Sequence, residues 1–194
     1  MKKADSLSLP LKLIHTEKYN QQFWQKNWTP FEWNKTLLFS YMINPHEIIY
    51  PNLKSGECYR IYETEAPITW EFGTLRGSTP AMLVDGEYLA FFHSGILAHS
   101  DVSWGEECWH YFMGAYTFSA SPPFGLTQIT TLPIVGKDFY TKSNHLKRVI
   151  FPGGFVTSGS HIHVAYGKDD CEMWIATLDK EALKKALVPL KLGK

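Results

Sequence analysis

The sequence repeats one pattern three times, at residues 29–41, 79–93 and 151–167. Each copy has an entry that contains proline, a short apolar run, a turn, and a second apolar run that ends in an aromatic residue or histidine. Apolar runs of this length between turn residues are typical of β-strands, and internal repetition at this spacing indicates an array of similar units. The repeat therefore predicts an all-β chain built from successive sheet units.

Further strand-sized runs follow each copy of the repeat. These runs lie at residues 46–50, 58–63, 109–118, 126–132 and 171–178. Each of the first two units then holds four strands in sequence, which is the layout of a β-propeller blade, and the third unit holds three. We expect one domain over residues 1–194, with blades of antiparallel strands at approximately 27–64, 78–134 and 149–178.

Helical periodicity is scarce. Residues 179–187 are predicted to form a short C-terminal helix, with Asp179 as its N-cap and an apolar face of alanine and leucine. A second short helix is predicted at residues 16–25. The run 9–14 is predicted to be a strand, either the outer strand of a preceding blade or the strand that closes the last one.

About three blades fall short of the roughly four to eight that close a propeller. An open arc leaves apolar blade faces and sheet edges uncovered. We therefore expect the chain to be part of a larger propeller, or to be completed by a homo-oligomer or a partner chain.

Composition excludes several classes of partner. The 194 residues contain 19 Lys and Arg against 19 Asp and Glu, so the net charge is zero, and neither nucleic acid nor an anionic membrane surface is an expected partner. The apolar runs are too short to span a bilayer. The three cysteines form no closely spaced pair, which predicts reduced, buried thiols in a cytoplasmic protein. The 7 Trp, 10 Tyr and 12 Phe suit either a β core or sugar stacking.

Polar residues near strand ends are the candidates for a ligand site, because the inner strands and loops of a propeller converge on a central pocket. Lys26 and Arg76 are candidate anion binders, Lys as a point charge and Arg as a planar fork that matches phosphate oxygens. Gly77 would let the backbone pass close to a ligand. His93 is either a hydrogen-bonded core histidine or a donor to sugar hydroxyls or phosphate.

Five further residues of the predicted blades are also candidates for this site. Tyr111 lies near the start of a strand and is expected to line the same mouth. Asp169 and Asp170 would point to opposite faces of a strand, so only one could enter the pocket, and a turn-capping role is the alternative. His161 and His163 share a strand face, but no third ligand accompanies them, and we expect no metal.

Several motifs together resemble glycoside hydrolase family 130, the five-bladed propeller enzymes that act on β-mannosides. These motifs are 26–31 (KNWTPF), 43–46 (INPH), 75–80 (LRGSTP), 85–93 (DGEYLAFFH), and 151–154 (FPGG) with 166–170 (YGKDD). They occur in the order of the family and correspond to its third to fifth blades. The family's N-terminal part, which carries the general acid in an Asp-Pro-Arg-type motif, has no counterpart here.

The resemblance implies a set of roles. Lys26 and His46 correspond to phosphate contacts, and Arg76 would join them. Arg76, His93, Tyr111 and Asp170 would bind substrate, Asp170 being the carboxylate that the family pattern indicates. The implied ligands are an oligosaccharide or a sugar phosphate, with inorganic phosphate as a co-substrate and no other cofactor.

Three functions are compatible with these residues. The first is inverting phosphorolysis or hydrolysis of a β-mannoside, in which a general acid protonates the leaving oxygen. The second is β-mannosyl transfer by a related propeller. The third is a non-catalytic sugar-binding or truncated propeller that assembles with a partner chain. Glu47 and Asp85 are available carboxylates, but nothing in their spacing singles out either as the general acid, so no catalytic residue is predicted.

Overall fold

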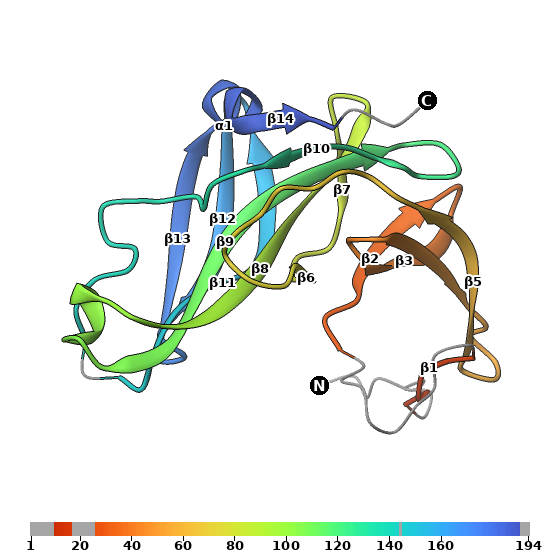
Figure 1. Cartoon of the computed structure of the whole chain (residues 1–194). Helices are drawn as coiled ribbons and strands as arrows, with labels where there is room; N and C mark the ends of the chain where they lie inside the picture. The colour runs from red at the N-terminus through yellow and green to blue at the C-terminus, as the bar shows by residue number, and fades with distance from the viewer. Residues whose placement is uncertain (1–9, 17–25, 144, 191–194) are drawn as a thin grey trace, which may run out of the picture.

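The computed structural model describes residues 10–16, 26–143 and 145–190, and it shows an all-β, propeller-like arrangement of three sheet units (Figure 1). The predicted helix at 16–25 lies almost wholly outside these ranges. The α-helix found within them has seven residues, and no helix there is long and apolar enough to cross a membrane.

Blade 1 is an antiparallel meander of four strands. They are β2 (Thr29–Trp33), β3 (Thr36–Met42), β4 (His46–Pro51) and β5 (Glu57–Thr64). Asn34 and Lys35 have φ of 48° and 62° and make the tight β2–β3 turn. The strand predicted at 9–14 is found only as β1 (Ile14–His15), which adds in parallel to the outer edge of β5. It therefore takes neither of its two predicted places, and extends blade 1 instead.

Blade 2 lies in the middle of the array. Its strands are β6 (Arg76–Gly77), β7 (Met82–Val84), β8 (Glu87–His99), β9 (Glu107–Ser119) and β10 (Leu126–Thr130). Both β6 and β7 pair with β8, so together they form one interrupted inner strand. The β8–β9 hairpin is longer than the blade and ends in a short 3₁₀ helix, η1 (Asp101–Ser103).

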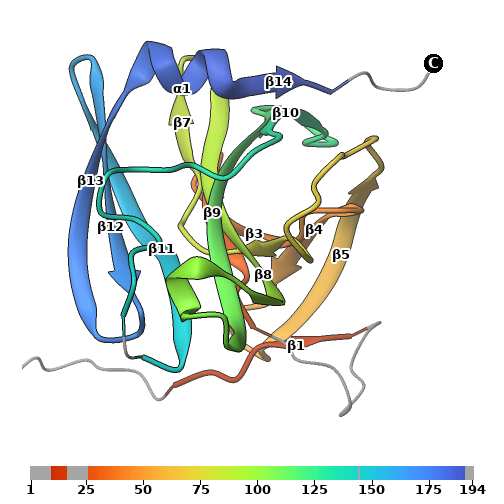
Figure 2. The same ribbon diagram turned by 60° about the vertical axis from the view of Figure 1, so that its left-hand side comes forward.

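Blade 3 has three strands, and the chain then returns to blade 2. The strands are β11 (Lys147–Ser158), β12 (His161–Lys168) and β13 (Glu172–Asp179). The predicted C-terminal helix is confirmed as α1 (Lys180–Ala186), with the Asp179 carboxylate accepting the Ala182 N–H at 2.7 Å. The following strand, β14 (Leu187–Pro189), pairs with β10, so the end of the chain ties blade 3 to the outer edge of blade 2 (Figure 2).

Two apolar clusters hold the blades together. Alternate residues of β8 face opposite ways, so Ala90 and Phe92 pack toward blade 1 while Leu89 and Phe91 pack toward blade 3. Burial of each large apolar side chain contributes roughly 1.5–3 kcal/mol. Gly114 completes the packing, because a Cβ there would lie 2.3 Å from the Phe92 ring. The middle blade is thus buried on both faces.

Two sequence-based expectations are corrected here. Asp169 and Asp170 lie in the β12–β13 turn with φ of 53° and 57°, not in a strand, so the argument from opposite strand faces does not apply. Of the three cysteines, which are all free, Cys58 alone is buried, Cys108 is partly exposed and Cys171 is exposed.

Candidate functional site

The sequence predicted one pocket in which Lys26, Arg76 and His46 bind phosphate and in which Arg76, His93, Tyr111 and Asp170 bind the sugar. Arg76 lies opposite His93 in the β6–β8 register. Burial lowers the pKa of His93, and the charges of Arg76 and then Lys26 lower it further. Two exposed cations therefore lie beside one buried histidine at the junction of blades 1 and 2.

Gly77 is the reason that blade 1 and blade 2 approach each other here. Its Cβ, if present, would lie 2.4 Å from both the Asn27 carbonyl oxygen and the Thr29 hydroxyl oxygen. Only glycine lets β6 pass this close to the segment that precedes β2. Gly77 thus makes room for the backbone of blade 1, rather than for a ligand as the sequence suggested, and it places Arg76 near Lys26.

His93 is neutral at physiological pH. Its exposed fraction is 3%, and its Nδ1 shares a 2.7 Å hydrogen bond with the Ser78 hydroxyl. Burial is the main cause that lowers its pKa to about 4, and the charges of Arg76 and Lys26 add to it. His93 is thus a hydrogen-bonded, buried histidine, and its alternative role as a donor to sugar hydroxyls or phosphate stays a prediction. The positive charge of the site comes from Arg76 and Lys26.

Aromatic rings form the wall next to His93. Tyr111 stacks with it at a ring-centroid distance of 6.0 Å and an angle of 25°, and Phe151 packs on it at 4.6 Å. Tyr111 is thus beside His93, as the sequence predicted. Phe151 was not among the predicted site residues, although it opens the third copy of the repeat, and its contact with blade 2 had no local signal.

Asp170 lies on the same side of the fold but in a separate contact. Its carboxylate is 3.7 Å from Lys147 Nζ, and both side chains are about half exposed. Its neighbour Asp169 is buried and accepts the Val149 N–H at 2.8 Å, which fixes the turn. Of the two adjacent carboxylates, Asp170 is the one available to a ligand.

His46 is placed in the interior between blades 1 and 2. Its exposed fraction is 1%, its Nε2 is 3.0 Å from the Ser40 hydroxyl, and its Nδ1 donates to the Phe124 carbonyl at 2.8 Å. Burial lowers its pKa to about 4, so it is neutral. With both ring nitrogens engaged, its position lends no support to the phosphate-binding role, which stays a prediction.

The two carboxylates considered as proton donors are both engaged elsewhere. Glu47 is fully buried and its Oε1 lies 2.5 Å from His15 Nε2. Asp85 lies in the β7–β8 turn, where hydrogen bonds from Lys180 and then Lys184 lower its pKa and keep it ionised. An ionised carboxylate cannot protonate a leaving group, so Asp85 does not serve as the general acid.

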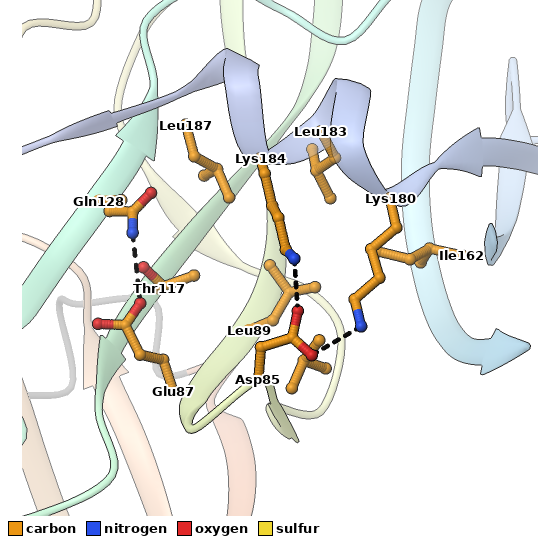
Figure 3. A pocket seen from close by; sticks show the side chains of 11 residues that line it. Asp85, Glu87, Leu89, Thr117, Gln128, Ile162, Lys180, Leu183, Lys184 and Leu187 are labelled. Carbon is orange, nitrogen blue, oxygen red and sulfur yellow. Dashed lines mark hydrogen bonds and ion pairs between the residues drawn. The ribbon is translucent and has the colours of Figure 1, made fainter. Parts of the chain in front are cut away.

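Asp85 also lines a cavity, together with Lys180 and Lys184 (Figure 3). The cavity has a volume of about 480 Å³ and lies beneath α1, between blades 2 and 3. Along β8, His93 lies six residues after Glu87, a separation of about 20 Å. The cavity and the cationic group are therefore distinct sites.

Comparison with solved structures identifies the fold. The chain is similar to the β-1,2-mannobiose phosphorylase from Listeria innocua in complex with β-1,2-mannobiose, with 18% identity, a TM-score of 0.56, and coverage of 83% of this chain and 46% of that one. It is similar to a putative glycoside hydrolase from Bacteroides ovatus, with 10% identity, a TM-score of 0.54, and coverage of 88% and 56%. A putative glycosidase from Bacteroides thetaiotaomicron gives 15% identity, a TM-score of 0.52, and coverage of 77% and 46%.

At these identities the likeness concerns the fold. No family model and no curated protein matches the sequence. The chain spans about half the length of the structures to which it is similar. It has the propeller-like fold of glycoside hydrolases and phosphorylases.

Proposed function

We propose that this chain carries part of the mannoside- and phosphate-binding site of a propeller similar to glycoside hydrolase family 130, and that the complete site performs inverting phosphorolysis of a β-mannoside. The observation that carries the proposal is the convergence of Arg76 and Lys26 beside the ring wall of His93, Tyr111 and Phe151. A cationic group against aromatic rings suits a ligand that has phosphate oxygens and an apolar sugar face.

In this reaction a phosphate oxygen attacks the anomeric carbon while the bond to the leaving oxygen breaks on the opposite face. Arg76 and Lys26 would hold the phosphate, with the guanidinium fork of Arg76 fixing its orientation. Neutral His93 would form part of the wall beside the sugar, with its ring held by the hydrogen bond between Nδ1 and the Ser78 hydroxyl. A general acid must protonate the leaving oxygen, and we assign it to a segment or chain that supplies further blades, since Glu47 and Asp85 are engaged.

The open faces of the array support completion by further blades. On blade 3, the exposed fractions of Met173, Ile175 and Val156 are 76%, 70% and 56%. Large exposed apolar patches of this kind mark interaction surfaces. We propose that a partner chain, a second copy or a further part of the same polypeptide covers them. The free thiols suit a reducing compartment, and the cytoplasm is the proposed location.

The proposal is tested by incubating the protein with β-1,2-mannobiose, with and without inorganic phosphate. Mannose 1-phosphate that forms only with phosphate supports phosphorolysis, and free mannose without phosphate supports hydrolysis instead. If no product forms but sugar and phosphate each raise the melting temperature, the binding part of the proposal holds and the chain by itself acts as a binding module, the second candidate, until the part that supplies the general acid is added. If neither ligand binds, the proposal is wrong.

The Arg76→Ala variant links this result to the site. Loss of charge-assisted hydrogen bonds worth about 1.5–3 kcal/mol predicts roughly ten- to hundredfold weaker phosphate binding. Arg76→Lys keeps the charge but loses the fork, so it should fall between the two proteins. Arg60→Ala, on the outer strand β5, is the matched control and should bind phosphate as the parent protein does.

A further inference from the structure

The cavity beneath α1 has one carboxylate in its wall that no cation compensates. Glu87, at the start of β8, lines the cavity, and its carboxylate accepts a long hydrogen bond of 3.5 Å from the Gln128 side-chain amide (Figure 3). Gln128 is neutral, and among the residues that the structure describes Glu87 forms no ion pair. The negative charge of Glu87 therefore faces the cavity without a counter-charge.

The floor of the cavity next to Glu87 is apolar. It is made of four aliphatic side chains, none of them more than 7% exposed: Leu89, Ile162, Leu183 and Leu187. They come from β8, β12, α1 and β14, so the floor forms where blades 2 and 3 meet the C-terminal segment. A volume of about 480 Å³ lies within the usual range for small-molecule sites, about 300–1,000 Å³. The cavity thus offers an apolar surface beside a single negative charge.

The other charges at the wall compensate one another. The Asp85 carboxylate lies 2.7 Å from Lys180 Nζ and 2.8 Å from Lys184 Nζ. Lys184 Nζ is also 2.9 Å from the Glu181 carboxylate. Two ammonium groups therefore face two carboxylates, and an anionic ligand would find no net positive charge there. The ligand that complements the remaining charge, on Glu87, is a cation.

We infer that this cavity binds a small aliphatic ammonium compound, with the ammonium group at Glu87 and the apolar body against Leu89, Leu183 and their neighbours on the floor. A primary ammonium has three donors for the carboxylate and amide oxygens at this wall. Quaternary ammonium ligands are recognised by aromatic rings, and none of the described residues that line the cavity is aromatic. The inference does not depend on the proposed function, because the cavity is distinct from the group around Arg76.

The test titrates the full chain by calorimetry at pH 7 with three probes of equal chain length, hexylamine, hexanol and hexanoate. Hexylamine is protonated at this pH, since an alkylammonium such as that of lysine has a pKa of about 10.4. The parent protein should bind hexylamine most tightly. Glu87→Gln keeps the shape of the side chain but removes its charge, so it should weaken hexylamine about tenfold or more and leave hexanol unchanged.

Glu106→Gln is the matched control, because Glu106 is an exposed carboxylate that does not line the cavity, and it should bind hexylamine as the parent protein does. Melting temperatures without probe establish that each variant is folded. Tighter binding of hexanoate than of hexylamine would assign recognition to the lysines and overturn the inference. It is also overturned if hexylamine and hexanol bind equally, if the two Glu→Gln variants have the same effect, or if no probe binds the parent protein.

Discussion

The two ends of the blades use charge in opposite ways. At the end covered by α1, Asp85 lies between Lys180 and Lys184, at 2.7 and 2.8 Å, so its charge is compensated within the chain. At the other end, Arg76 and Lys26 act together on the buried His93, which lowers its pKa. The α1 end therefore holds a carboxylate between two ammonium groups, whereas the Arg76 end brings two cations near one buried, neutral imidazole. The comparison contrasts an ion-paired end of the blades with a cationic end, and the proposed function assigns phosphate to the cationic one.

Acidification should destabilise the Arg76 end of the blades before the α1 end. His93 and His46 have folded pKa values of about 4 against 6.5 when unfolded, so only the unfolded chain gains their protons as the pH falls below 6.5. Above pH 6.5 both histidines are neutral in the folded and the unfolded chain, so they cost no stability. As the pH falls from 6.5 to 4, the free energy of unfolding decreases by at most about 3 kcal/mol for each histidine. The lowered pKa of Asp85 places its own loss at still lower pH.

Hydrogen exchange at pH 7 and pH 5 measures this difference. Amides of β6 and of β8 near His93 should lose protection at pH 5, while those of α1 should change less. Equal loss at both ends would contradict the comparison. His93→Asn and His46→Gln should each reduce the number of protons taken up on acid unfolding by about one.

Gly77→Ala should disrupt the packing of blade 1 against blade 2 at the Arg76 end. The new Cβ would meet the Asn27 carbonyl and the Thr29 hydroxyl at 2.4 Å, so blades 1 and 2 must separate, at a cost of about 1–3 kcal/mol. We expect a lower melting temperature and a raised pKa for His93 by NMR titration, because Arg76 and Lys26 move apart. Gly86→Ala is not a clean control because its φ is 90°, whereas Gly154→Ala has open space and no positive φ. If Gly154→Ala is as harmful as Gly77→Ala, the close approach at Gly77 is not the cause.

Asp85→Asn should produce the smallest effect. It removes the charge between Lys180 and Lys184 at a half-exposed position, so the melting temperature should fall slightly, and less so in high salt. Phosphate binding at the Arg76 end should not change, which titration checks. An altered phosphate affinity would show that the two ends are coupled and would remove the distinction drawn between them.

The sequence predicted the elements better than their partners. The threefold repeat indicated four-strand units, and Asp179 indicated the start of α1, because turn residues and caps act within a few residues. The grouping of Arg76 with His93 also followed from repeat-equivalent strand ends. The interior position of His46 did not, because its hydrogen-bond partner, Phe124, is far along the chain.

The sequence by itself determined an all-β array of blades, a C-terminal helix, and a set of polar residues near strand ends. Local alternation and turn chemistry are sufficient for these features. Only the tertiary structure decided that β14 pairs with β10 and that Phe151 packs on His93. These contacts join distant segments across blades, and they depend on which sheet edges and faces are left open when the blades pack.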